Sequence, residues 1–447
     1  MNDKNESNGG MSKDQFEAFM KAFLANQNGQ DPEALAEAIG LPKDPAALAD
    51  LLKHLQNAMG ASGVSGANPR DSGVNWQLAA NQAKTVAGEA SVAIKDSTRG
   101  ALHAAVSVGS LWLNAATAIS ELTSEPKLLG RELWVDDAMP LFEDLATPVG
   151  NRMSTALSEN LTQNAPEELA SILGSATGLM KSAGGALFAV QLGQAIGKMS
   201  SQVISGGDIG LPLFKDQRAA FVPQNLDEFV AGLEVEPDQA YIYLTIREMA
   251  HARLFKHSKW LRDAVVSQIA KYASEISIDN DRVTEMTQAF DPNNMDELRE
   301  ALETGAFIAD RTQDQQQALD NIETLLALIE GWVDVVTEES TKLLPKSAAI
   351  GEAVRRRRAT GGPAELTFGT LVGLELRPRK LREATALWRE ITNQLGIEKR
   401  DGLWNHPDLV PTSEDIANPQ ALISRLQNSK AENEDFDQAL RDLLGDN

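Results

Sequence analysis

Residues 237–263 read PDQAYIYLTIREMAHARLFKHSKWLRD, and they predict a helix that begins near Pro237 and meets no later glycine or proline. On such a helix Glu248 and His251 lie three positions apart and share one face. Histidine is scarce, with 5 copies in the chain, and two of them, His251 and His257, stand close together in this stretch. If the protein carries a chemical site, we expect it on this helix.

The spacing resembles the zincin metallopeptidase helix, H-E-x-x-H, whose histidines bind zinc and whose glutamate takes a proton from the metal-bound water. Arg247 stands at the first histidine position, and a guanidinium cannot ligate zinc. His257 is the nearest replacement, at the interval between the second and third histidines of the longer metzincin motif, although Leu254 stands where that motif has a glycine. His257 can join His251 only if the helix ends or kinks after Phe255.

A second stretch, TLLALIEGWVDVVTEES at 324–340, predicts an apolar helix that two carboxylates interrupt. Glu330 and Asp334 lie four positions apart, on one face of that helix. The gluzincin branch of the zincins takes its third ligand from a later helix with the pattern E-x-x-x-D, in which the aspartate orients a ligand histidine. Glu330 and Asp334 match that pattern.

Two further stretches, RRRRATGGPAELTFGTLVGLELRPRKLREATALW at 355–388 and LWNHPDLVPT at 403–412, complete the pattern. With them the chain resembles, from about residue 75 to 425, a bacterial family of zinc-dependent hydrolases described as zincin-like metallopeptidases. The resemblance implies a soluble, largely helical, metallopeptidase-like protein, and most members of the family have no known substrate. The site candidates that it implies are Glu248, His251, His257, Glu330 and Asp334.

The first hypothesis is therefore a zinc-dependent peptidase or related amide hydrolase, in which Glu248 is the general base for a metal-activated water. Its zinc ligands are His251, His257 and Glu330. Three more residues have supporting roles: Asp334 orients a ligand histidine, Arg247 binds a substrate carbonyl or carboxylate, and His406 is a further ligand or a substrate contact. The alternative for His406 is a side chain that anchors its loop.

The second hypothesis is a catalytically silent helical scaffold or interaction protein. In that case Arg247 and Glu248 form an ordinary ion pair, and Glu330 and Asp334 are buried partners of arginines. A di-iron helical bundle is set aside because it needs two E-x-x-H motifs and the sequence has one.

Composition excludes several other classes of protein. Acidic residues outnumber basic ones by 64 to 41, and the resulting net charge of -23 disfavours binding to nucleic acid or to an anionic membrane. Cysteine is absent, so any metal must use His, Asp or Glu. The start of the chain, MNDKNESNGGMSKDQ, lacks the features of a secretory signal, and no stretch has the length and apolarity of a membrane span. We expect a cytoplasmic protein.

Strand-like alternation is nearly absent, so the fold is predicted to be mainly α: a multi-helix zincin-like domain with at most a very small β-sheet, near 213–235. Residues 1–73 contain short amphipathic helices and a linker rich in glycine and serine, and they are predicted to be a separate docking segment for a protein partner. Residues 74–425 form the single helical domain, and 426–447 an acidic tail. The glycine-rich stretch 205–226 is predicted to be a wall or lid of the site.

Overall fold

The computed structural model describes residues 74–163, 185, 188–211, 213–277, 279, 309–359 and 379–428. All of them belong to the larger of two compact units of the chain, which consists of Pro69–Asn280 and Phe307–Asn447. The docking segment predicted at 1–73 lies outside the described residues, as does the acidic tail from 429 onward. Both stay predictions.

Helices make up most of the described chain, and the prediction of a mainly α fold is confirmed. Their bounds are α4 (Trp76–Gly88), α5 (Asp96–Ala116), α6 (Arg131–Gln163), α8 (Pro223–Ala231), α9 (Pro237–His257), α10 (Trp260–Ser274), α13 (Gln313–Ser340), α14 (Ser347–Ala359), α16 (Leu381–Leu395), α17 (Ile397–Gly402) and α18 (Ser413–Ala417), with a 3-10 turn η2 (Pro407–Leu409). Residues 188–200 and 419–428 are helical as well.

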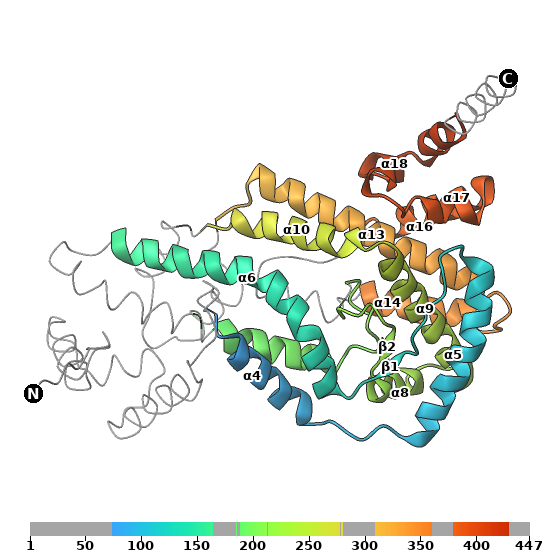
Figure 1. Cartoon of the computed structure of the whole chain (residues 1–447), viewed down its shortest axis with the longest axis horizontal. Helices are drawn as coiled ribbons and strands as arrows, with labels where there is room; N and C mark the ends of the chain where they lie inside the picture. Colours follow the sequence, from blue (N-terminus) through green and yellow to red (C-terminus); the bar gives the residue numbers. More distant parts are fainter. Residues whose placement is uncertain are drawn as a thin grey trace, which may run out of the picture. The chain divides into compact units, whose positions relative to one another are not determined.

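The described strands form one small parallel sheet. Strand β1 (Lys127–Leu128) pairs with β2 (Ala220–Phe221), with Lys127 opposite Ala220. Strand β2 falls inside the range in which the sequence predicted a short sheet. The sheet ties the segment before α6 to the segment that leads into α8, and it fixes the end of the loop that covers α9 (Figure 1).

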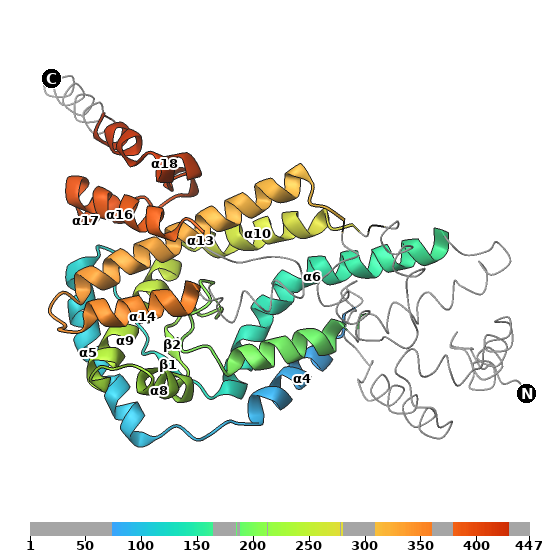
Figure 2. The ribbon, with the colours of Figure 1, turned by 180° about the vertical axis from the view of Figure 1, so that it is seen from behind.

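Helix α9 lies at the centre of the described fold. It starts at Pro237, as predicted, because proline suits the first helical turn, where its missing N–H costs nothing. Helices α5, α8, α13 and α14 pack against it, and α9 lies between α5 and α14 in both views (Figures 1 and 2). Its middle turns are buried on every side, so polar residues there must find partners inside the protein.

Helix α13 crosses the fold beside α9 and carries the predicted 324–340 segment. A capping box fixes its start: the Thr312 hydroxyl accepts from the Gln315 backbone, and the Gln315 side chain accepts from the Thr312 N–H. Helix α16 approaches it closely at Gly331, where a Cβ atom would lie 2.8 Å from the backbone nitrogen of Thr385. This glycine therefore allows two helix backbones to meet.

Helix α5 contains most of residues 100–120, GALHAAVSVGSLWLNAATAIS, which carry no Asp, Glu, Lys or Arg, and it packs against α9 and α13. Within the described ranges, no helix combines the length and the apolarity that a membrane span needs.

Candidate functional site

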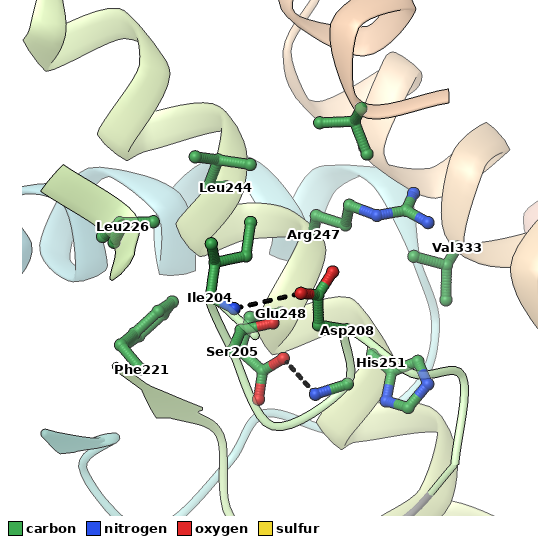
Figure 3. A pocket seen from close by; sticks show the side chains of 12 residues that line it. Ile204, Ser205, Asp208, Phe221, Leu226, Leu244, Arg247, Glu248, His251 and Val333 are labelled. Carbon is green, nitrogen blue, oxygen red and sulfur yellow. Dashed lines mark hydrogen bonds between the residues drawn. The ribbon is translucent and has the colours of Figure 1, made fainter. Parts of the chain in front are cut away.

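One face of α9 places Arg247, Glu248 and His251 beneath the loop of residues 204–211 (Figure 3). The loop is held to the sheet because the Gly206 N–H donates to the Ala220 carbonyl at 2.9 Å, and the Val222 N–H donates to the Ile204 carbonyl at 3.0 Å. The prediction that 205–226 forms a wall of the site agrees with this position. The first turn of this stretch covers the polar face of α9.

Glu248 is 3% exposed, and backbone groups hold both of its carboxylate oxygens. Oε1 accepts the Ala220 N–H at 2.9 Å, and Oε2 accepts the Gly207 N–H at 2.7 Å. Burial raises the pKa of Glu248 to about 7, although the hydrogen bonds from Ala220, Gly207 and Ser205 work in the opposite direction. A carboxylate with this pKa is half protonated near neutral pH, which suits a group that takes up and returns a proton.

His251 lies one helical turn beyond Glu248 and is 5% exposed. Burial, together with the positive charges of Arg358 and Arg247, lowers the pKa of His251 to about 3. Its imidazole is therefore neutral at physiological pH, which is the form that ligates metals. Its Nε2 atom is buried and has no hydrogen-bond partner in the described structure. The ring packs against Phe255, with 4.8 Å between the ring centroids.

Arg247 bonds the two carboxylates of α13. Its Nη2 donates to Glu330 Oε2 at 2.5 Å, and its Nη1 donates to Asp334 Oδ1 at 2.6 Å. The structure thus brings Glu330 and Asp334 to the face of α9 that carries Glu248 and His251. Arg247 bonds these two carboxylates and forms no ion pair with its neighbour Glu248.

Two arginines of α14 join the cluster, and neither is among the predicted site residues. Arg358 Nη1 donates to Glu330 Oε2 at 2.5 Å, and Arg357 bonds both oxygens of Asp208 at 2.7 and 2.8 Å. Their side chains are 13% and 20% exposed. The charge of Arg357 holds the pKa of Asp208 below its usual value, although burial acts in the opposite direction. The run of four arginines at 355–358 was the sequence feature that could have indicated these two site residues.

Glu330 keeps one oxygen free in this crowded setting. Both arginines bond Oε2, whereas Oε1 is buried and has no hydrogen-bond partner among the described groups. The loop lies close to the side chains of both Glu330 and His251. A Cβ atom on Gly210 would lie 3.1 Å from Glu330 Oε1, and one on Gly207 would lie 2.4 Å from His251 Nδ1. His251 and Glu330 therefore face the same short loop segment.

The other two predicted histidines lie elsewhere. The assumption that the helix ends or kinks after Phe255 is wrong, because α9 continues to His257 and Ser258 still donates to the Leu254 carbonyl. His257 is exposed, and its Nε2 lies 2.7 Å from Asn405 Oδ1. His406 is also exposed and caps the turn η2 through a hydrogen bond from the Asp408 N–H. The structure does not bring either histidine to the Glu248 cluster.

The described cluster does not form a complete zinc site. His251 Nε2 and Glu330 Oε1 are ligand atoms of the kinds that zinc takes, and both are buried without a partner. A catalytic zinc has three protein ligands, however, and nowhere in the described ranges do three His, Asp or Glu side chains stand together as a metal site would require. The arrangement thus fits two ligands and leaves the third unassigned.

The space inside the cluster is small. The hollow lined by Ser205, Gly207, Arg247, Glu248 and His251 has a cavity volume of about 20 Å³, which is room for about one water molecule. A water there would be close to the proposed base, but a peptide could not enter while the loop is in place.

Comparison with known proteins supports the assignment of the fold and of the family. A family model described as a zincin-like metallopeptidase matches residues 74–423. The crystal structure of a protein described as a putative hydrolase with a novel fold, from Chloroflexus aurantiacus, is similar with a TM-score of 0.55 and 18% sequence identity. The match covers 79% of this chain and 99% of that one. No curated protein matches the chain.

Proposed function

The chain belongs to the zincin-like metallopeptidase family, and from that premise we propose that it hydrolyses a peptide or related amide bond with Glu248 as the general base. The observation that carries this proposal is the buried Glu248 carboxylate with a pKa near 7, one turn from a neutral histidine with a free nitrogen. A base of this pKa can accept a proton from water and return it to the leaving amine.

His251 and Glu330 would hold the zinc ion that the family implies. Each would use its unpartnered atom, so Glu330 can keep both arginines on its other oxygen. A zinc ion bound there would act as a Lewis acid toward water and toward the substrate carbonyl. His257 is left out of this ligand set because it lies at the helix end beside Asn405.

Arg247 has a positioning role in this proposal. Its hydrogen bonds to Glu330 and Asp334 fix the face of α13 against that of α9. Asp334 in turn anchors Arg247. The role of Asp334 in this proposal is therefore to orient Arg247, and not to orient a ligand histidine. Glu330 is then held by two guanidinium groups in the position where its free oxygen faces the loop.

Substrate entry requires the loop 205–211 to move. The hollow beneath it has room for about one water, and the Gly207 N–H occupies an oxygen of Glu248. When the loop withdraws, Glu248 loses this hydrogen bond and gains access to a substrate. We therefore propose that the loop is a lid that opens to admit the substrate and closes over it, which excludes water from the reacting groups.

The test measures cleavage of a peptide library by the full chain, purified without a histidine tag and supplied with zinc. Glu248→Gln should lower the rate at least about 100-fold, because the contribution of a general base is of that order. Glu339→Gln, a carboxylate of α13 that bonds Lys342 at the surface, is the matched control and should retain full activity. Equal cleavage by Glu248→Gln and the parent would refute the role of Glu248.

A further inference from the structure

Arg253 lies on the side of α9 opposite Glu248 and His251, and it is buried without a hydrogen-bond partner among the described residues. At about 100° per residue, Arg253 shares a stripe with Met249 and Lys256, and this stripe points roughly 180° away from His251. Arg253 is 2% exposed. Among the residues that the structure describes, no hydrogen bond or ion pair reaches its guanidinium, and its Nε atom is fully buried.

An arginine buried in this way is unusual, because buried charges are nearly always paired. The buried Arg400 of this protein follows the rule, since it bonds Asp401 and the Ala116 carbonyl. Burial lowers the pKa of Arg253, and the more distant Glu121 only partly offsets the effect. The carboxylate of Glu121 accepts a hydrogen bond from Asn114 instead. Among the described residues no carboxylate forms a direct ion pair with Arg253, and Glu121 offsets its charge only in part.

Arg253 lines a hollow with a cavity volume of about 180 Å³ that opens to solvent between α5, α9 and the 121–126 segment. This volume is below the roughly 300–1,000 Å³ of sites for drug-sized ligands, so the hollow has room for a small ligand only. Polar groups are available at its border: the Ser110 hydroxyl lies on α5, and Lys256 donates to the Thr123 hydroxyl at 2.8 Å. The guanidinium, a second cation nearby and hydroxyl groups together favour a negatively charged group beside Arg253.

The rest of the lining decides which anion fits. Val106, Leu122, Pro126 and Met249 make much of the wall apolar, and a second hollow of about 100 Å³ shares Val106, Glu125 and Pro126 with the first. Glu121 and Glu125 also line the first hollow, and their charges disfavour a ligand with two negative charges. The lining therefore favours a single carboxylate that carries an apolar body.

We propose that this hollow is a binding site for a small monocarboxylic acid, whose carboxylate forms a bidentate pair with Arg253 and whose apolar body lies against α5. Guanidinium and carboxylate match in this geometry because two parallel N–H groups meet two oxygens. The site is separate from the Glu248 cluster, and it does not depend on the proposed hydrolase activity.

The test uses the full chain and three sodium salts at constant ionic strength: hexanoate, acetate and phosphate. Isothermal titration calorimetry should detect saturable binding of hexanoate, weaker binding of acetate because it lacks the apolar body, and no binding of phosphate. Arg253→Met should weaken hexanoate binding about 10-fold to 100-fold, as expected for loss of a charge-assisted pair. Arg382→Met, at an exposed arginine of α16, should leave the affinity unchanged.

A second variant covers the case in which Arg253→Met fails to fold. Ser110→Leu fills the hollow without changing its charge, and it should weaken hexanoate binding to a similar extent. The site proposal is overturned if hexanoate does not bind the parent, if it binds Arg253→Met equally well, or if phosphate binds more tightly than hexanoate. Zinc content and peptide cleavage should be unaffected in Arg253→Met, so the outcome is distinct from that of the hydrolase proposal.

Discussion

Two buried arginine–carboxylate clusters of this protein differ in how completely their polar atoms are bonded. In the first, Asp401 accepts the Trp332 indole N–H at 2.8 Å and the Thr117 hydroxyl at 2.7 Å. Its neighbour Arg400 donates to Asp401 and to the Ala116 carbonyl at 2.7 and 2.8 Å. This cluster joins α17 to α13 and to the end of α5, and both oxygens of its carboxylate are bonded.

The second cluster has Arg247 and Arg358 around Glu330, with His251 and Glu248 beside them. Here Glu330 Oε1 and His251 Nε2 are buried without a partner. A group of this kind costs free energy in the folded state, so it needs a reason. The completed cluster stabilises the fold, whereas the incomplete one contains the two atoms that we propose as metal ligands.

The largest effect is expected in the completed cluster. Asp401→Ala should lower the free energy of unfolding by about 3–5 kcal/mol, because it leaves Arg400 buried without its counterion. Urea unfolding measures the loss. Asp408→Ala, at a side chain that is 87% exposed, should change stability by less than about 0.5 kcal/mol. A small loss in Asp401→Ala would mean that the two clusters do not differ in the way described.

The next effect concerns pH. The pKa of Glu248 is about 7 in the folded protein against 4.5 for the free side chain, so the folded state holds the proton more tightly. This contribution is fully present below about pH 4.5 and is lost as the pH rises to about 7. Relative to the parent, Glu248→Gln should therefore gain about 3 kcal/mol across that interval.

The opposite sign applies to His251, whose folded pKa is about 3 against 6.5 for the free side chain. It contributes stability above about pH 6.5, which is lost as the pH falls toward 3. The contributions of Glu248 and His251 to the stability of the parent overlap in pH. The quantity to follow is therefore the difference in free energy of unfolding between Glu248→Gln and the parent. Urea unfolding of chelator-treated protein at several pH values measures it, and a difference that does not vary with pH would contradict the raised pKa of Glu248.

A smaller effect is expected at Glu330. Glu330→Gln keeps the shape of the side chain but removes the charge that faces Arg247 and Arg358. It should lower the free energy of unfolding by about 2 kcal/mol, the order expected for a hydrogen bond to a charged group, because Arg247 keeps Asp334. Thermal and urea unfolding check this value. No loss at all would indicate that Glu330 is not the anchor of the cluster.

The smallest effect concerns the lid. Gly207→Ala should lower stability by about 1–2 kcal/mol, because the new methyl group would lie 2.4 Å from His251 Nδ1 and the loop must shift. Gly100→Ala is the matched control, since a Cβ there meets nothing within 4 Å and alanine favours the α5 helix by about 0.5–1 kcal/mol. Hydrogen exchange at loop 205–211 should be faster in Gly207→Ala. Unchanged exchange would contradict the packing of the loop on His251.

The sequence was sufficient to predict the helices that carry the site residues. It was insufficient to predict which side chains of different helices bond one another. Pro237 and the unbroken run after it predicted the start of α9, and the spacing of Glu330 and Asp334 predicted that α13 would present both carboxylates on one face. Local spacing could not reveal which cations reach those carboxylates. Arg358 comes from α14, and tertiary packing alone decides that it bonds Glu330.

The error at His257 has a physical reason. The metzincin spacing suggested a turn after Phe255, but neither glycine nor proline follows Phe255 directly. The helix therefore continues to His257, and the Ser258 N–H closes its last turn by donating to the Leu254 carbonyl. His257 is therefore carried to the surface beside Asn405. Leu254 stands where the metzincin motif has a glycine, and this difference was the sequence feature that indicated an unbroken helix.

The most direct test of the central claim is the zinc content of the protein, purified without a histidine tag and equilibrated with zinc at about stoichiometric concentration. We expect about one zinc per chain, lost in both His251→Ala and Glu330→Gln and kept in Asp408→Ala. Zinc bound equally by the parent and by both cluster variants, or by none of these proteins, would contradict the assignment of the incomplete cluster as the metal site.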